Sequence, residues 1–135
     1  MALMVWTDEL VDGVASIDTQ HHELVDLMNA LYDSALAGEG AVTVRLFDTL
    51  LEHTVAHFRH EESLFIATGY PDASRHRHHH ELLTAKAIEY RDCAAAGDFK
   101  ALTAEILPKL RDFLAFHILK DDKETCAFLN AQGIS

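Results

Sequence analysis

Histidine is the residue of this chain with the most potential for chemistry, and it is concentrated in a few short stretches. The stretch RHRHHHELL, residues 75–83, holds four of the ten histidines, and HFRHEE, residues 57–62, holds two more beside a pair of glutamates. Imidazole and carboxylate groups are ligands of transition metals. In the pairs His57/Glu61 and His76/His80 the spacing of four residues puts both side chains on one helix face, with Cβ atoms about 5–6 Å apart. Each pair could therefore bind one metal ion or two adjacent ions.

Helices must position these side chains, because the apolar residues recur every three or four positions and almost no strand-like alternation is present. Three helices are expected from Asp18 or Thr19 to residues 37–40, over 42–68, and from Asp72 or Ser74 to 96. A fourth helix should begin at about residue 98, and Pro108 either kinks it or marks its true first turn. A short tail helix is expected over 122–130. Short loops with glycine or proline join them. This pattern predicts an all-α fold, an antiparallel up-down-up-down four-helix bundle, preceded by an extended N-terminal arm over residues 1–17.

The inward-facing positions of these helices carry polar residues where a core would be apolar. They include His21 in the first helix, His57 and Glu61 in the second, His76 and His80 in the third, and His117 in the fourth. A single histidine on an apolar face is commonly a core residue bonded to a carbonyl group. Burying an imidazole or a carboxylate costs several kcal/mol unless it is paired or bound to a metal. Because all four helices contribute at a similar level of the bundle, a shared metal site is the better interpretation.

The acidic ligand of the last helix is ambiguous. Asp121 stands four residues after His117 and shares its helix face, whereas Asp122 stands five residues after it and is rotated well off that face. Only a distortion near the end of the helix would bring Asp122 into the site. The helix geometry alone leaves both acids open.

The ligand types favour iron. Structural zinc prefers four ligands, and this set offers five histidines and two carboxylates. Imidazole together with carboxylate suits iron, and two carboxylates can bridge two iron ions. The chain has two cysteines far apart, Cys93 and Cys126, so neither a zinc cage nor a disulfide framework is indicated.

Composition limits the remaining function classes. The 135 residues suit a single domain, 1–135, and 49% of them are hydrophobic. The formal net charge of −11 repels phosphate backbones and anionic lipid surfaces, so we expect neither nucleic acid nor a membrane as partner. No transmembrane span or secretory signal is recognisable, and a cytoplasmic location is expected.

The motifs as a group resemble the hemerythrin family, in particular the single-domain bacteriohemerythrins. The segment that enters the family's first helix is resembled by GVASIDTQHHEL, and the family motif H-F-x-x-E-E by HFRHEE. A Tyr-Pro segment followed by H-x-x-x-H is resembled by YPDASRHRHHHELL, and the motif H-x-x-x-x-D by HILKDD. The resemblance covers nearly the whole chain. It assigns the metal ligands as His21, His57, Glu61, His76, His80, His117 and Asp122, and so favours Asp122 over Asp121.

The resemblance implies two iron ions bridged by Glu61, Asp122 and an oxo or hydroxo group. It places His76, His80 and His117 on one iron and His21 and His57 on the other, which keeps a position for dioxygen. The implied function is reversible dioxygen binding for transport, storage or scavenging by a protein that is not an enzyme and is expected to be a monomer. The alternatives are a di-iron oxidase or peroxidase, and an oxygen- or iron-sensing module acting through a separate protein partner.

The surroundings of the site are also predicted, and they depart from the family pattern in places. An apolar lining is expected from Leu24, Met28, Leu50, Leu83, Leu110, Phe113 and Leu114. Phe113 replaces a tryptophan of many members, Phe65 stands where a methionine is common, and His53 stands where an aromatic residue is frequent. His22, His60, His78 and His79 are expected in solvent, whereas His53 could also contact the back of His57.

Overall fold

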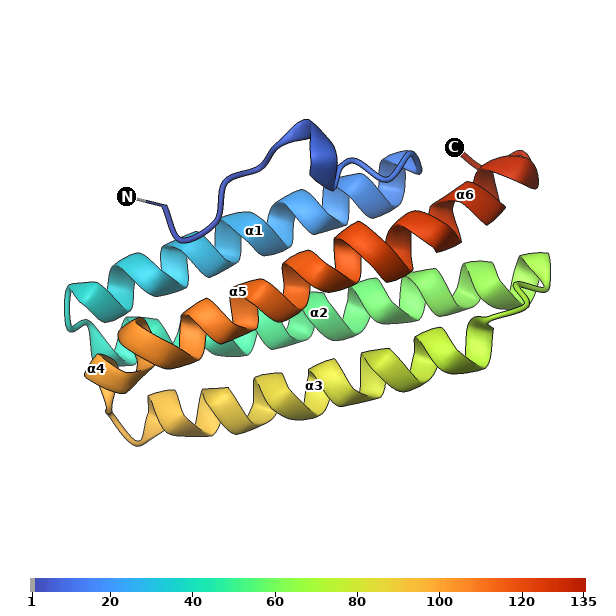
Figure 1. Ribbon diagram of the computed structural model, residues 1–135. Coiled ribbons are helices and arrows are strands. Elements are labelled where there is room, and N and C mark those ends of the chain that lie inside the picture. Colours follow the sequence, from blue (N-terminus) through green and yellow to red (C-terminus); the bar gives the residue numbers. More distant parts are fainter. Residues whose placement is uncertain (1) are drawn as a thin grey trace.

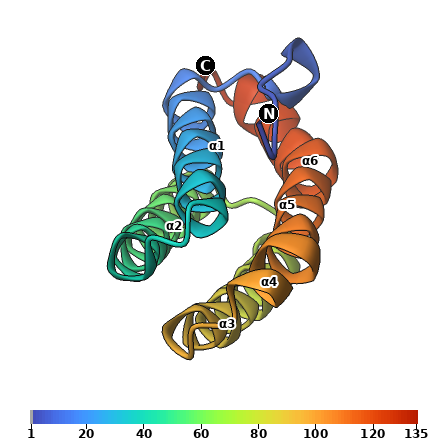
Figure 2. The ribbon, with the colours of Figure 1, turned by 90° about the vertical axis from the view of Figure 1, so that its left-hand side faces the viewer.

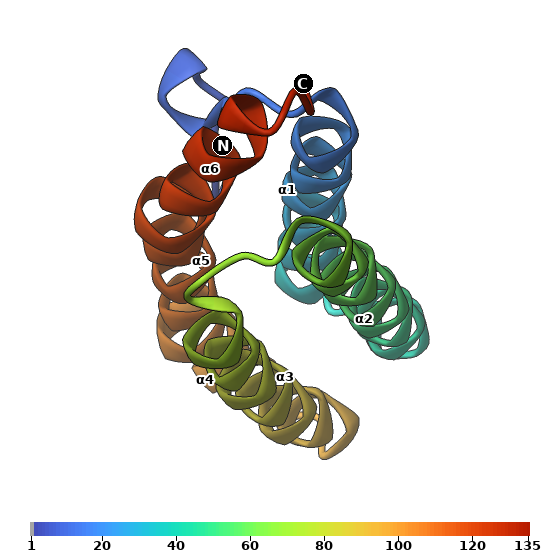
Figure 3. The same ribbon diagram turned by 90° about the vertical axis from the view of Figure 1, so that its right-hand side faces the viewer.

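Four helical rods run antiparallel along the molecule in the computed structural model, which describes residues 2–135 (Figure 1). The first three rods are α1 (Ala15–Leu36), α2 (Gly40–Thr68) and α3 (Ala73–Ala95). The fourth rod is continuous and consists of α4 (Phe99–Ala101), the π-helical turn η2 (Leu102–Ile106), α5 (Leu107–Phe116), the π-helical turn η3 (His117–Asp122) and α6 (Lys123–Ala131). The predicted all-α, up-down-up-down bundle is therefore confirmed. Viewed along its axis, the four rods surround a common centre (Figures 2 and 3).

The N-terminal arm is confirmed, but it is shorter than predicted. α1 begins at Ala15 rather than after Asp18, and the arm contains one short 3₁₀ turn, η1 (Asp8–Leu10). The Asp18 carboxylate does not cap α1. It accepts hydrogen bonds from the backbone N–H groups of Asp12 at 2.7 Å and of Gly13 at 3.1 Å, so it fastens the end of the arm to the first turns of α1.

The turn after α2 depends on a left-handed backbone. Gly69 has a φ of 66°, a conformation that residues with a Cβ atom adopt only at a cost, and its N–H donates to the carbonyl of Phe65 at 2.9 Å. Pro71 follows two residues later and cannot continue the helix. The chain consequently reverses into α3, as the sequence predicts.

Pro108 lies inside the fourth rod, as its second position in α5. A proline in a regular α-helix removes one hydrogen bond and its ring clashes with the carbonyl four residues earlier. The wider π turn η2 lies directly before α5 and accommodates this defect, so the rod continues. The predicted tail helix is also not separate, because α6 continues α5 through the second π turn.

The apolar core fills the half of the bundle that includes the α1–α2 and α3–α4 loops. Its buried members are Leu24, Met28, Leu31, Ala35, Phe47, Leu50, Tyr90, Ala94, Leu102, Leu107 and Leu110. A smaller cluster under the arm joins Met4 and Leu10 to Val25 and Ile118. A third cluster joins Val14 and Ile17 to Cys126 and Leu129 at the opposite end of the bundle. The largest apolar cluster therefore lies at one end, but both ends are packed. None of the helices in residues 2–135 combines the length and the apolar character needed to cross a lipid bilayer.

We predict that Leu31→Ala lowers the free energy of unfolding by about 2–5 kcal/mol, because Leu31 is fully buried in this core. Leu36→Ala at the exposed end of the same helix is the matched control and should change it by less than about 0.5 kcal/mol. Urea unfolding of the metal-free protein, followed by circular dichroism, measures both. Equal losses for the two variants would contradict this location of the core.

Candidate metal centre

The side chains predicted as ligands converge in the other half of the bundle, and every rod contributes. His21 comes from α1, His57 and Glu61 from α2, His76 and His80 from α3, and His117 and Asp122 from η3, and each is at most 3% exposed. Their potential ligand atoms form two overlapping groups, and within each group the atoms lie within 4.8 Å of one another. One group contains His76, His80 and His117, the other contains His21 and His57, and Glu61 and Asp122 belong to both.

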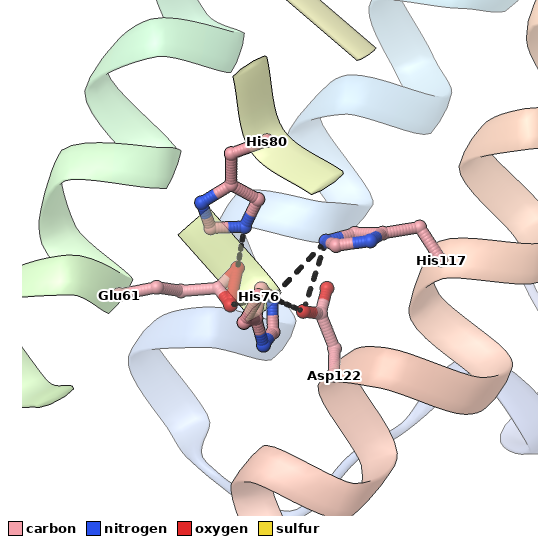
Figure 4. A group of neighbouring side chains, drawn as sticks. All are labelled: Glu61, His76, His80, His117 and Asp122. Carbon is pink, nitrogen blue, oxygen red and sulfur yellow. Dashed lines mark hydrogen bonds and ion pairs between the residues drawn. The ribbon is translucent and has the colours of Figure 1, made fainter. Parts of the chain in front are cut away.

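The Nε2 atoms of the five histidines face the two carboxylates. Asp122 receives three of them: His76 at 2.8 Å and His117 at 3.1 Å on Oδ1, and His21 at 2.9 Å on Oδ2. Oε1 of Glu61 lies 2.8 Å from Nε2 of His57 and 3.7 Å from Nε2 of His80. Figure 4 shows how Glu61, His76, His80, His117 and Asp122 point toward one another from α2, α3 and the fourth rod. Carboxylates from two rods thus lie between three imidazoles on one side and two on the other.

Protein groups alone leave this cluster unsatisfied. Among residues 2–135, both carboxylate oxygens of Glu61 and of Asp122, and Nε2 of His21, His57 and His80, are buried without a hydrogen-bond partner. An unpaired buried polar group costs about 1–3 kcal/mol, and more when it is charged. These nitrogen and oxygen atoms converge at short distances without forming hydrogen bonds. A metal ion requires this arrangement, because it binds the lone pairs of several such atoms at once. The residues therefore fit a metal group of more than one ion.

The π turn η3 explains how both acids of the fourth rod are used. In an α-helix, residue i+5 points about 140° away from residue i, whereas the wider π turn brings it back toward the same face. Asp122 consequently reaches Nε2 of His117 at 3.1 Å. Asp121 lies behind the ring and accepts a hydrogen bond from its Nδ1 at 3.1 Å. The distortion lies within a continuous rod, not at its end.

The Nδ1 atoms of the histidines point away from the centre to partners that sequence reasoning did not assign. Nδ1 of His57 donates to Oε1 of Gln20 at 2.6 Å, and Nδ1 of His76 shares a hydrogen bond with Oγ1 of Thr125 at 2.7 Å. Nδ1 of His80 lies 3.4 Å from Oε2 of Glu62. A histidine that donates from Nδ1 keeps the Nε2 lone pair free for a metal. These partners orient the rings and set their tautomers.

Burial keeps two of the histidines neutral. It lowers the pKa of His57 to about 3 and that of His80 to about 2, with neighbouring histidines contributing in the same direction. Metal binding requires this neutral form. Burial, together with the charge of Asp122, also raises the pKa of Glu61 well above its usual range.

His117 and Asp122 form a strongly polarised pair. Burial alone would lower the pKa of His117, but Asp122 and Asp121 outweigh it and raise that pKa to about 9. Burial would raise the pKa of Asp122, yet the charge of His117, whose Nε2 lies 3.1 Å from Oδ1, holds that pKa well below its usual range. The positive charge on His117 compensates the buried Asp122 carboxylate, and a bound cation would take over this compensation.

Aromatic rings close the site toward solvent. The ring of Phe58 stacks on His80 with centroids 3.8 Å apart, and Phe65, which is fully buried, lies 4.9 Å from His76. Of the predicted lining, Leu24, Met28, Leu50 and Leu110 are buried, and Leu83 and Leu114 are half-buried. Phe113 lines a surface pocket together with Leu83 and His117, but it is 41% exposed and so is not part of a dry lining.

The remaining histidines lie mostly where the sequence predicts them. His22, His53 and His78 are exposed, and Nδ1 of His53 lies 3.7 Å from Oε2 of Glu23. His79 was wrongly expected in solvent. It is half-buried, and its Nδ1 lies 2.8 Å from Oδ2 of Asp121, the same oxygen that accepts from His117. His60 is also half-buried, with Nε2 2.9 Å from Oγ of Ser16.

The fold and these residues define a class of protein, a four-helix bundle with a buried cluster of histidines and carboxylates supplied by all four rods. The sequence profile of the Hemerythrin HHE cation binding domain matches residues 12–129. The chain therefore belongs to the hemerythrin family, and the predicted membership is confirmed.

Individual relatives and structures agree with this assignment. The chain is 34% identical over 122 residues to a bacteriohemerythrin of Pseudomonas aeruginosa, which covers 90% of this chain and 78% of that protein. It is 32% identical over 124 residues to a bacteriohemerythrin of Methylococcus capsulatus, which covers 91% of this chain and 94% of that protein. A crystal structure of wild-type hemerythrin superposes with a TM-score of 0.81 at 31% identity, covering 95% of this chain and 98% of that one.

We predict that deleting Lys120 from the π turn leaves the bundle folded, because the turn holds one residue more than an α-helical turn and α6 can stay in register. Deleting the exposed Asp112 from the regular helix α5 is the control. It rotates everything after it by about 100° and should prevent cooperative folding. Thermal unfolding monitored by circular dichroism separates the two outcomes. Loss of folding in the Lys120 deletion as well would contradict this role of η3.

Proposed function

We propose that this chain binds dioxygen reversibly at a centre of two iron ions. The observation that carries the proposal is the pair of overlapping ligand groups that share Glu61 and Asp122. Two shared carboxylates bridging two ions account for both groups at once, whereas a single ion would leave several of the seven side chains without a partner. The hemerythrin membership of the chain and the bacteriohemerythrins among its relatives support the same function.

The ligand groups suggest how the ions are divided. His76, His80 and His117 would hold one iron, and His21 and His57 the other, with Glu61, Asp122 and an oxo or hydroxo group between them. The ion with two histidines would have a position free for dioxygen. When bound, a pair of ferrous ions supplies two electrons that dioxygen can take up and return.

The residues of the chain favour binding over further oxidation chemistry. Five ligands are neutral imidazoles and only two are carboxylates, whereas the di-iron enzymes of bundle fold carry more glutamates. Phe58 and Phe65 cover the imidazoles of His80 and His76 with apolar rings, which excludes water from that side. Exclusion of water and protons protects a reversibly bound oxidant. The alternatives are a di-iron oxidase or peroxidase, and a sensing module that acts through another protein.

The setting of this function is also a proposal. The chain would act as one domain, since the family profile spans residues 12–129 of the 135. We further expect a monomer that works in the cytoplasm.

The decisive test is the reversibility of oxygen binding. Stopped-flow absorption of the ferrous protein mixed with oxygen, followed by argon, should show a coloured form that returns to the colourless one over repeated cycles. A carrier gives back nearly all of the oxygen it takes up. Irreversible conversion in the first cycle, or turnover of oxygen with an added reductant, would identify an oxidase instead.

A second prediction concerns the shared carboxylate. Glu61→Ala should lose both irons together, because Glu61 belongs to both ligand groups. Glu52→Ala, an exposed position of the same helix, is the control and should keep two irons per chain. Metal analysis after gel filtration measures both. One zinc per chain in the wild type, or one iron retained in Glu61→Ala, would contradict a centre of two bridged irons.

A further inference from the structure

A third group of potential ligands lies behind His21, outside the proposed iron centre. Asp12, Asp18 and His21 each offer one ligand atom, and these atoms lie within 4.8 Å of one another. Asp12 comes from the arm, and the other two residues come from the first turns of α1. We call these three residues the loading site.

Asp12 is the residue that indicates a ligand here. Its side chain is fully buried, and neither of its carboxylate oxygens has a hydrogen-bond partner. A buried carboxylate without a partner is costly, so the structure must retain it for a purpose that involves another group.

The distance between Asp12 and His21 fits a cation between them. Oδ2 of Asp12 lies 3.8 Å from Nδ1 of His21, which is too long for a hydrogen bond. Two ligands of one metal ion, each roughly 2.0–2.2 Å from it, lie about 2.8–3.6 Å apart at angles between 90° and the tetrahedral value. The two atoms would therefore have to close by a few tenths of an ångström around a bound cation. One nitrogen and several carboxylate oxygens suit a divalent cation such as Fe²⁺ or Mn²⁺.

The arm is held rigidly enough to present Asp12 at this place. Asp18 binds the backbone N–H groups of Asp12 and Gly13, and Nδ2 of Asn130 donates to the carbonyl of Gly13 at 3.0 Å. Gly13 has a φ of 103°, and a Cβ atom there would lie 3.0 Å from Oδ1 of Asn130. Glycine is therefore required at the point where the arm turns toward His21.

The three residues are graded in burial. Asp18 is half-buried, Asp12 is buried, and His21 is fully inaccessible. The opposite edge of the His21 ring points into the centre, where Nε2 lies 2.9 Å from Oδ2 of Asp122. The same imidazole thus borders the loading site with one nitrogen and the iron centre with the other.

We propose that Asp12, Asp18 and Nδ1 of His21 bind a divalent iron ion on its way into the centre. The inference rests on the proposed iron centre and adds to it a route of loading. A neutral imidazole has one lone pair, so His21 ligates the incoming ion through Nδ1 or a resident ion through Nε2, but not both. Asp12 and Asp18 would hold the incoming ion on the Nδ1 side of the ring, and transfer inward would leave Nε2 of His21 as the ligand of the resident ion.

Lys123 is the cationic side chain beside Asp12. Its Nζ lies 3.9 Å from Oδ1 of Asp12 and donates to the carbonyl of Glu9 at 3.1 Å. The half-exposed ammonium group partly compensates Asp12, and an arriving cation would have to displace it. The overall charge of −11 favours the approach of cations to the protein.

The experiment measures the rate of iron uptake by the full chain. Metal-free protein is mixed anaerobically with Fe²⁺, and a coloured chelator added at increasing times reports the iron not yet protected. Asp12→Asn should slow uptake roughly tenfold or more, because it removes the buried charge at nearly constant size. Asp8→Asn changes the net charge equally at an exposed position of the same arm and should leave the rate unchanged. Uptake of Mn²⁺ can be measured through the loss of the electron paramagnetic resonance signal of the free ion. It should likewise be slower in Asp12→Asn than in Asp8→Asn and the wild type.

Lys123→Met provides a test in the opposite direction. Removal of the competing ammonium group should speed uptake several-fold, and this variant decides the matter if circular dichroism shows that Asp12→Asn does not fold. Equal rates for Asp12→Asn and Asp8→Asn, or no acceleration in Lys123→Met, would overturn the loading site. The final iron content of the wild type is read separately. Fewer than two irons would refute the iron centre, whereas a full content reached at an Asp12-independent rate would refute only the route.

Discussion

The structure depends on one constraint, which is that seven polar and ionisable side chains lie buried between four rods without enough protein partners. Burial of an isolated charge costs many kcal/mol, and even a buried ion pair is rarely favourable by itself. The metal-free cluster responds by unequal protonation, because Glu61 holds a proton more readily while Asp122 stays charged against His117. A metal group that satisfies all of them removes this conflict, so its binding energy would also stabilise the fold.

The bundle can tolerate this cost because its largest apolar core and its polar ligands lie in different halves. The half near the α1–α2 and α3–α4 loops is filled with apolar side chains such as Leu31, Phe47, Leu102 and Leu107. These side chains hold the four rods together at that end, and the smaller cluster of Val14, Ile17, Cys126 and Leu129 does so at the other. The other half can then hold polar groups in preset directions. Each half also contains one π turn of the fourth rod. The turn η2 accommodates Pro108, and η3 directs Asp122 toward the other ligands.

The sequence predicts the parts that follow from helical periodicity. The four rods and the pairs His57/Glu61 and His76/His80 follow from spacings of three and four residues. Asp122 does not, because a π turn leaves no simple signature, and only the family resemblance selected it. Gln20 and Thr125 were missed because each binds a histidine of another rod, a contact set by how the rods pack. Phe113 lies on the same periodic stripe as His117, as predicted, but periodicity does not show that the pocket it lines with α3 is open to solvent.

The groups behind the histidines differ between the two sides of the centre, and the difference fits the proposed division of ligands. On the side of three histidines, Glu62 and Asp121 place carboxylates behind His80 and His117, and Asp121 also contacts the half-buried His79. A carboxylate behind an imidazole makes it a stronger donor. On the other side, His57 has a neutral amide and His21 has only the more distant Asp12. If the proposed centre is correct, the first side would hold its ion more firmly than the second, because the imidazoles of the second side are less strongly polarised.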